Sequence, residues 1–254
     1  MRRSAYRLAG VFIVFLLAVA STAASAAEFR LVRDETQPDV PVLYMTGKIQ
    51  KGDAASLSRL LKSNLKYGPS VTEIWLNSPG GELDEAVRIG ELIEKLGYTA
   101  IVPLGATCAS ACFFVWVGAS ARLAPGDLVI HRPYFHMRDS SQSPSDFENA
   151  YRATNEAAAL YLRQRNVPAY LIERMLQLSS ADGYPLSSED KVRIGPMSTA
   201  RSEYMVQNCG FPNATKSGQI LARGGLTVSE REVLRKCGMQ FYSKQKEAFF
   251  SPSD

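Results

Sequence analysis

Short apolar runs alternate with longer amphipathic stretches through the middle of the chain. The apolar runs predict strands, and the stretches between them carry apolar residues at helical spacing. Strands are expected at residues 42–49, 71–76, 98–104 and 128–130, and helices at residues 53–64, 82–96 and 109–118. This order predicts an α/β fold in which a mostly parallel sheet is covered by crossover helices.

The predicted helices differ in how much of their surface is apolar. Residues 82–96 place Leu83, Ala86 and Ile93 on one face, whereas residues 109–118 are almost wholly apolar and predict a helix buried on all sides. Asp53 is expected to cap the first helix. Ser145-x-x-Glu148 and Ser187-x-x-Asp190 resemble capping boxes that begin later helices, and a further helix is expected after Pro168.

The first 27 residues have the composition of a secretory signal peptide. Arg2, Arg3 and Arg7 precede an apolar run at residues 8–20, and Ala24-Ser25-Ala26 fits a cleavage site. An uncleaved membrane anchor is the alternative, but a spanning helix needs about 20 apolar residues. We therefore expect a periplasmic or secreted protein that has no membrane segment after cleavage.

Three segments are predicted: a signal peptide at residues 1–27, one domain at residues 28–200, and a C-terminal appendage at residues 201–254, where the pattern weakens. The formal net charge is +4, and loss of the three signal-peptide arginines leaves about +1. No basic stripe with interleaved aromatic residues is present, so nucleic acid is not an expected partner.

The chain has four cysteines, Cys108, Cys112, Cys209 and Cys237. An even number in an exported chain favours disulfides, and four cysteines allow three pairings. We prefer Cys209 with Cys237, which would staple the appendage, and Cys108 with Cys112. Zinc is a weaker alternative because the two histidines lie away from the cysteines and no Cys-x-x-Cys occurs. No metal and no cofactor are predicted.

Three features carry candidate chemistry. Ser78-Pro79-Gly80-Gly81 lies where a strand gives way to a helix, so its amides can point into a cleft. Ser110 begins the apolar helix among small residues, and His131 ends a strand at the carboxyl edge of the sheet, where α/β sites gather. Each has a structural alternative: a turn glycine, a helix-capping serine and a satisfied histidine.

In this order and context the three features resemble the ClpP peptidase signature of the ClpP/crotonase superfamily. The resemblance covers residues 42–197 and implies repeated ββα units with packed helices. It implies a triad of Ser110 as nucleophile, His131 as base and Asp182 as the orienting acid. Asp139, Asp146 and Asp190 remain rivals of Asp182 for that role. The resemblance also implies that the backbone N–H groups of Gly81 and Ala111 form the oxyanion hole, and it implies a homo-oligomer.

The chain also departs from the family. Export makes an ATP-driven unfoldase an unexpected partner, and the two cysteines beside Ser110 are unusual. A lysine base at Lys48 or Lys51 stays open, whereas a cysteine nucleophile is not favoured because no arginine or lysine lies in residues 105–121.

We expect an exported serine hydrolase, a peptidase acting on small or unfolded polypeptides. One alternative is a non-catalytic module of the same fold that binds peptides or assembles with partners. A crotonase-type acyl-CoA enzyme is a third possibility, and export argues against it because such an enzyme needs coenzyme A in its compartment.

Overall fold

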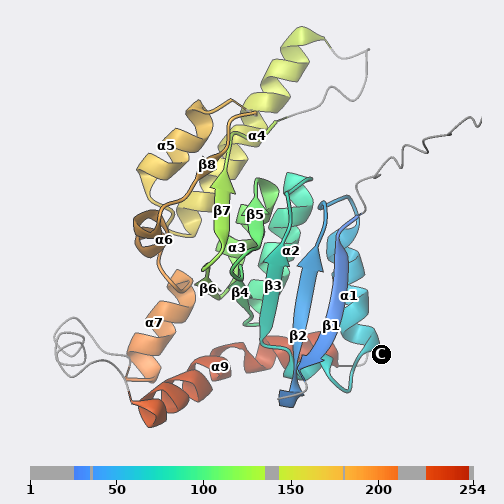
Figure 1. Cartoon of the computed structure of the whole chain (residues 1–254), viewed down its shortest axis with the longest axis vertical. Coiled ribbons are helices and arrows are strands. Elements are labelled where there is room, and N and C mark those ends of the chain that lie inside the picture. Colours follow the sequence, from blue (N-terminus) through green and yellow to red (C-terminus); the bar gives the residue numbers. More distant parts are fainter. Residues whose placement is uncertain (1–25, 35–36, 135–142, 180, 211–226, 252–254) are drawn as a thin grey trace, which may run out of the picture.

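The computed structural model describes residues 26–34, 37–134, 143–179, 181–210 and 227–251. Its larger sheet has five strands in the order β1-β2-β3-β4-β6 (Figure 1). The strands are β1 (Glu28–Asp34), β2 (Gln37–Thr46), β3 (Glu73–Asn77), β4 (Thr99–Ile101) and β6 (Ala121–Leu123). β1 pairs with β2 as an antiparallel hairpin, and all the other pairings in this sheet are parallel. The predicted signal peptide lies almost wholly outside the described residues.

A second, three-stranded sheet has the order β5-β7-β8. β5 (Thr107–Ala109) is parallel to β7 (Asp127–Ile130), and β8 (Tyr184–Pro185) is antiparallel to β7. A parallel bridge between Ser78 and Cys108 joins the end of β3 to β5 and so connects the two sheets. The predicted α/β fold with mostly parallel strands is confirmed.

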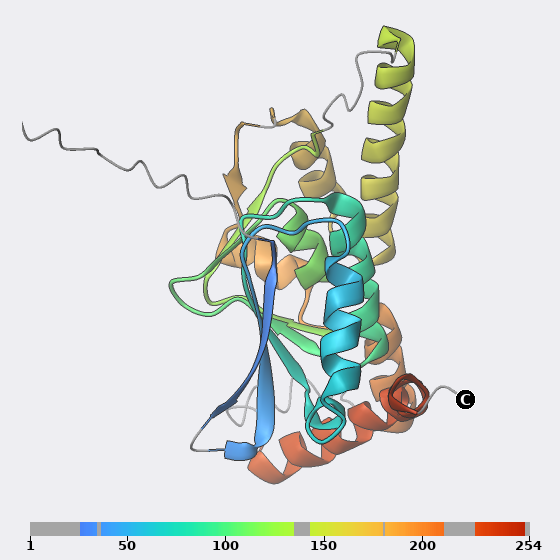
Figure 2. The same ribbon diagram turned by 90° about the vertical axis from the view of Figure 1, so that its right-hand side faces the viewer.

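Three helices cover one face of the larger sheet (Figure 2). They are α1 (Asp53–Ser63), α2 (Leu83–Lys95) and α3 (Ala111–Gly118). Alternate strand residues point toward them and are fully buried: Leu43, Met45, Ile74, Leu76 and Ala100. Every residue of α3 is buried, as its composition predicts. Gly90 and Gly118 let α2 and α3 approach closely, since a Cβ on Gly118 would lie 2.7 Å from the Gly90 Cα.

The remaining helices follow β7 along the chain. They are α4 (Pro144–Gln164), α5 (Ala169–Gln177), α6 (Ser188–Ile194), α7 (Thr199–Asn208) and α9 (Val228–Phe250), with a 3₁₀ turn η1 (Gly68–Ser70) after α1. The amino-terminal part of α4 extends beyond the sheets (Figure 1). The capping box of Ser187 and Asp190 is confirmed.

Two predicted helix starts differ from the structure by one or two residues. The N-cap of α1 is Gly52, because the Asp53 carboxylate folds back and accepts the backbone N–H of Gln50 at 2.7 Å. The N-cap of α4 is Ser143 rather than Ser145, since the Ser143 hydroxyl accepts the N–H of Asp146 and Pro144 fits the first helical position. The Ser143 hydroxyl thus binds a free amide of the first turn of α4, whereas α1 has no side-chain cap and Asp53 binds an amide that precedes the helix.

The C-terminal helix α9 packs on the rest of the fold. Tyr242 is 2% exposed, and a Cβ on Gly97 would lie 2.7 Å from its ring. Lys246 Nζ donates to the carbonyl of Val71 at 2.7 Å. The Cys209–Cys237 disulfide connects the end of α7 to α9, with 5.7 Å between the Cα atoms. None of the described helices is long and apolar enough to cross a membrane.

Candidate active site

Ser110 occupies the single position between strand β5 and helix α3. Its φ of 56° and ψ of −125° are unusual for a residue with a side chain. Its amide donates to the carbonyl of Val129 on β7 at 2.9 Å, which fixes this conformation. A strained serine at a sharp strand-to-helix turn presents its hydroxyl outward, as nucleophilic serines do in hydrolases.

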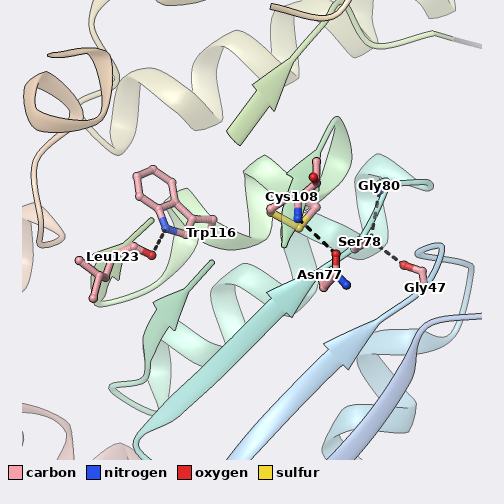
Figure 3. Close-up of a disulfide and its surroundings, with 9 residues drawn as sticks. Gly47, Asn77, Ser78, Gly80, Cys108, Trp116 and Leu123 are labelled. Atoms are coloured by element: carbon pink, nitrogen blue, oxygen red, sulfur yellow. Dashed lines mark hydrogen bonds between the residues drawn. A yellow bond between two sulfur atoms is a disulfide. The ribbon is translucent and has the colours of Figure 1, made fainter. Parts of the chain in front are cut away.

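A disulfide brackets this turn. Cys108 on β5 and Cys112 on α3 are bonded, with 5.2 Å between their Cα atoms, and both residues are fully buried (Figure 3). The bond crosses from strand to helix over Ser110. Both predicted disulfides are therefore present in the structure, and no cysteine is free to act as a nucleophile.

The glycine turn after β3 is held against Ser110. The buried Ser78 hydroxyl donates to the carbonyl of Gly47 at 2.6 Å and accepts the N–H of Gly80 at 3.1 Å (Figure 3). Gly80 has a φ of 93°, and a Cβ on it would lie 2.7 Å from the Ser110 Cβ. Only glycine fits this close approach of the two turns.

Two backbone N–H groups are left unused at this junction. Ile49 donates to the carbonyl of Gly80 at 2.8 Å and accepts the N–H of Glu82 at 3.0 Å, which fixes the peptide planes around Gly81. Among the described residues, the N–H groups of Gly81 and Ala111 make no hydrogen bond. Ala111 is also the first residue of α3, where a helix has free donors.

Ser110, His131, Gly81 and Ala111 line one pocket of about 140 Å³. The structure thus brings together four of the five predicted catalytic and oxyanion residues. Lys48 also lines the pocket, whereas Lys51 does not. The other lining residues are Glu82, Leu83, Asp84, Phe114, Pro133, Tyr134 and Thr154.

His131 follows β7, and its ring is oriented by the backbone of the next residue. Nδ1 lies 2.9 Å from the carbonyl oxygen of Arg132. A carbonyl can only accept, so Nδ1 carries the proton and Nε2 is the basic nitrogen. The ring of Tyr134 stacks on the imidazole with centroids 6.1 Å apart. Within the described residues no hydrogen bond joins Ser110 to His131; catalytic contacts commonly tighten when a ligand binds.

Asp182 does not contact His131 in this structure. Its carboxylate accepts the hydroxyl of Ser179 at 2.7 Å. The segment that holds it leads into β8, where Tyr184 pairs with Ile130, the residue before His131. Asp182 is therefore close to His131 in the sheet register, but the carbonyl of Arg132 takes the position at Nδ1.

The rival carboxylates have other partners. Asp190 accepts Tyr170 at 2.6 Å and Tyr184 at 3.3 Å, besides capping α6. Burial opposes ionisation of Asp190, but these hydrogen bonds outweigh it and lower its pKa. Asp146 accepts the hydroxyl of Ser143 at 2.7 Å, and Asp139 lies outside the described residues.

The contacts of His131 with the Arg132 carbonyl and with Tyr134 are not predicted by the sequence pattern. A backbone acceptor leaves no signal in the residue type. Tyr134 could have been suspected as a neighbour of His131, because both residues come directly after strand β7. Within the described part of the chain, no three His, Cys, Asp or Glu residues lie where they could share a metal ion.

No protein-family model matches the chain, and no curated protein matches it either. Among solved structures it is similar to a serine-to-alanine mutant of 1510-N, described as a membrane-bound stomatin-specific protease. That match has 19% identity and a TM-score of 0.45, and it covers 66% of this chain and 83% of the other. It is also similar to an asparagine-to-aspartate mutant of ClpP1 from Listeria monocytogenes. There the identity is 17% and the TM-score 0.46, with 61% and 88% of the two chains covered. The resemblance to ClpP is found again as this distant structural similarity.

Proposed function

We propose that this protein is a serine hydrolase, a peptidase acting on small or unfolded polypeptides. The observation that carries the proposal is the shared pocket of Ser110 and His131, with Ser110 held at a positive φ between a strand and a helix. A capping serine has no need of this strained conformation, since serine caps helices from extended backbone.

The proposed reaction begins with attack of the Ser110 hydroxyl on a peptide or ester carbonyl. Nε2 of His131 takes the hydroxyl proton as the Oγ–C bond forms and later gives it to the leaving amine or alcohol. Water then attacks the acyl-enzyme, again with His131 as the base, and releases the acid and free Ser110. The unused N–H groups of Gly81 and Ala111 are suited to bind the oxyanion in both steps, and each such donor contributes about 3–4 kcal/mol.

Asp182 is proposed as the third member of the triad when substrate is bound. In the substrate-free form the Arg132 carbonyl sets the tautomer of His131. A carboxylate stabilises the imidazolium of the transition state better than a carbonyl does. Tyr184 on β8 pairs with Ile130 on β7, so Asp182 precedes β8 at the level where His131 follows β7. A small movement of the segment before β8 would bring the Asp182 carboxylate to Nδ1.

The test is labelling by a fluorophosphonate probe. Wild-type protein is expected to be labelled stoichiometrically, and Ser110→Ala is expected to abolish labelling while Ser63→Ala, an exposed serine on α1, leaves it unchanged. His131→Ala should slow labelling by about 10²–10⁴-fold. Unlabelled wild-type protein with a native fold would contradict the proposal.

A non-catalytic peptide-binding or assembly module is the second candidate. It is favoured by the missing hydrogen bond between Ser110 and His131 and by the pairing of Asp182 with Ser179. Peptide binding without labelling or cleavage would support it. Asp182→Asn distinguishes the two candidate functions further, because it should slow cleavage only if Asp182 orients His131 in a catalytic triad.

We also propose that the protein is exported and works in the periplasm or outside the cell as a homo-oligomer. The two disulfides are consistent with an oxidising compartment outside the cytoplasm. Fractionation of cells producing the full chain, with N-terminal sequencing of the mature protein, tests cleavage after Ala26 or Ala27.

A further inference from the structure

Three arginine side chains outside the pocket are buried or nearly buried, on β6, at the end of α4 and on α7. Arg122 is on β6 and points to the helical side of the larger sheet, like its strand neighbour Ala100. Arg122 is 4% exposed and Arg201 on α7 is 9% exposed. The side chain of Arg165, which ends α4, is 11% exposed. The proposed hydrolysis uses none of these groups.

The charges of these groups are not balanced. Arg165 makes an ion pair with Glu94, 3.4 Å between Nη2 and Oε2. Within the described residues neither Arg122 nor Arg201 makes an ion pair. Burial raises the pKa of Glu94, although Arg165 and Arg122 act against the shift. Glu94 therefore faces the guanidinium groups of Arg165 and Arg122 and the carboxylate of Glu91, whereas Arg201 has no carboxylate partner among the described residues.

Several donors in this region have no acceptor. Arg122 donates through Nη1 to the carbonyl of Arg165 at a long 3.5 Å, and its Nε and Nη2 have no partner. Arg201 donates through Nη1 to the Ser120 hydroxyl at 3.0 Å, and its Nε has no partner. The hydroxyl of Tyr242 on α9 is likewise buried without a hydrogen bond. The hydroxyls of Ser198 and Ser120 are polar neighbours that act to lower the pKa of Tyr242, but neither meets the Tyr242 hydroxyl with the geometry of a hydrogen bond, and the Ser120 hydroxyl already bonds Tyr98 and Arg201.

An uncompensated buried cation is costly to a folded protein. A buried donor without an acceptor costs about 1–3 kcal/mol, and more when it is charged. Burial lowers the pKa of Arg122 to about 10, so the group still carries its charge at neutral pH. Glu94, Arg165 and Tyr242 all lie close enough to Arg122 to affect its pKa, with Glu94 acting against the lowering.

We propose that Arg122 and Tyr242 bind a small inorganic anion, of the size of chloride, beneath helix α9. The donor set is suited to an anion, because guanidinium N–H groups accept nothing and the free Tyr242 hydroxyl can donate. Arg122 and Tyr242 are 4% and 2% exposed, and such close packing favours a small ion over a larger oxyanion. The bound anion would neutralise part of the charge of the arginines and fasten α9 to β6.

The experiment measures the thermal unfolding temperature of the full mature chain at constant ionic strength while potassium gluconate is replaced by potassium chloride. Gluconate is too large for the site. The unfolding temperature is expected to rise along a saturable curve, by roughly 5–10 °C at about 100 times the dissociation constant. Sulfate at equal ionic strength should give a smaller rise. No difference between chloride and gluconate would overturn the proposal.

Variants connect the effect to the site. Arg122→Met is expected to weaken the chloride midpoint by about tenfold or more, and Tyr242→Phe by roughly three- to tenfold. Arg235→Met is the matched control, since this arginine lies on the exposed surface of α9 with its side chain 59% exposed. Equal midpoints in wild type and Tyr242→Phe, or an undiminished response in Arg122→Met, would overturn the proposal. If Arg122→Met does not fold, the wild-type titration, Tyr242→Phe and the anomalous signal of bromide in crystals still decide the question.

Discussion

Cys108 and Cys112 form a disulfide that encloses Ser110 between a strand and a helix. The two cysteines are four positions apart, so the covalent ring is small and contains the strained residue at its centre. Such a ring limits the conformations that Ser110 can adopt when the neighbouring structure fluctuates. The disulfide is therefore placed to maintain the geometry of Ser110, the proposed nucleophile, as well as the stability of the fold.

Removal of each disulfide should affect stability and probe labelling differently. Replacing Cys108 and Cys112 by alanine is expected to cost about 2 kcal/mol of unfolding free energy, because the closed loop is short, and to slow probe labelling several-fold. Replacing Cys209 and Cys237, which are 28 positions apart, should cost about 3–4 kcal/mol and leave labelling unchanged. Urea unfolding and labelling rates of both double variants check this. Equal labelling rates would assign the first disulfide a purely structural role.

Gly80→Ala should impair the site more than the fold. A Cβ at Gly80 would collide with the Ser110 turn, whereas Gly105, with a similar φ of 80°, has nothing within 4 Å of its Cβ position. Both substitutions are expected to lose about 1–2 kcal/mol from left-handed strain. Only Gly80→Ala should also slow labelling, by tenfold or more. If Gly105→Ala slows it as much, the close approach of the two turns is not the cause.

Asp190 should make the free energy of unfolding decrease at acidic pH. Burial disfavours its charged form, but hydrogen bonds from Tyr170, Ser187 and Tyr184 prevail and lower its pKa. A lowered folded-state pKa means that the contribution of Asp190 is present above the unfolded value of 3.8 and is lost as pH falls through the lower folded value. Asp190→Asn should be less stable than wild type at pH 7, and the gap should close toward pH 3. Urea unfolding at both pH values checks this; a constant gap would contradict it.

Lys246 should make stability rise with pH in the alkaline range. Burial against Tyr98 lowers its pKa from 10.5 to about 8. Between these two values the unfolded chain binds more protons than the folded one, so stability attributable to this group rises with pH. Relative to Lys246→Met, the wild-type protein should therefore gain unfolding free energy from pH 7.5 to pH 10. A difference that stays constant over this range would show that Lys246 has an ordinary pKa.

The elements that the sequence predicted well are those with a strong local pattern. The wholly apolar α3 and the Ser78-Pro79-Gly80-Gly81 turn can be predicted from the local sequence without knowing which distant segments pack against them. Helix α9 is not predicted by the sequence pattern, because its apolar residues do not form a continuous stripe. The capping box of Thr227 and Glu230 is the local signal that would have found it.

The features that could not be predicted from the sequence depend on contacts between distant segments or on the conformation of single peptides. Arg122 lies in a strand of ordinary composition, and its burial depends on α4 and α9, which come later in the chain. The choice of the Arg132 carbonyl as the partner of His131 depends on the conformation of a single peptide. The role of Asp182 and the segment boundaries at residues 27 and 200 stay predictions.

The bridge between Ser78 and Cys108 lies where the two sheets meet, so the candidate site is at the boundary between them. Ser110 and His131 follow strands of the smaller sheet, whereas Gly81 follows a strand of the larger one. A slight slide of one sheet over the other would keep nucleophile and base together yet withdraw one oxyanion donor. The proposed nucleophile and base thus follow one sheet and one proposed oxyanion donor follows the other, so a ligand that separates the two sheets is expected to block the proposed hydrolysis while leaving Ser110 intact.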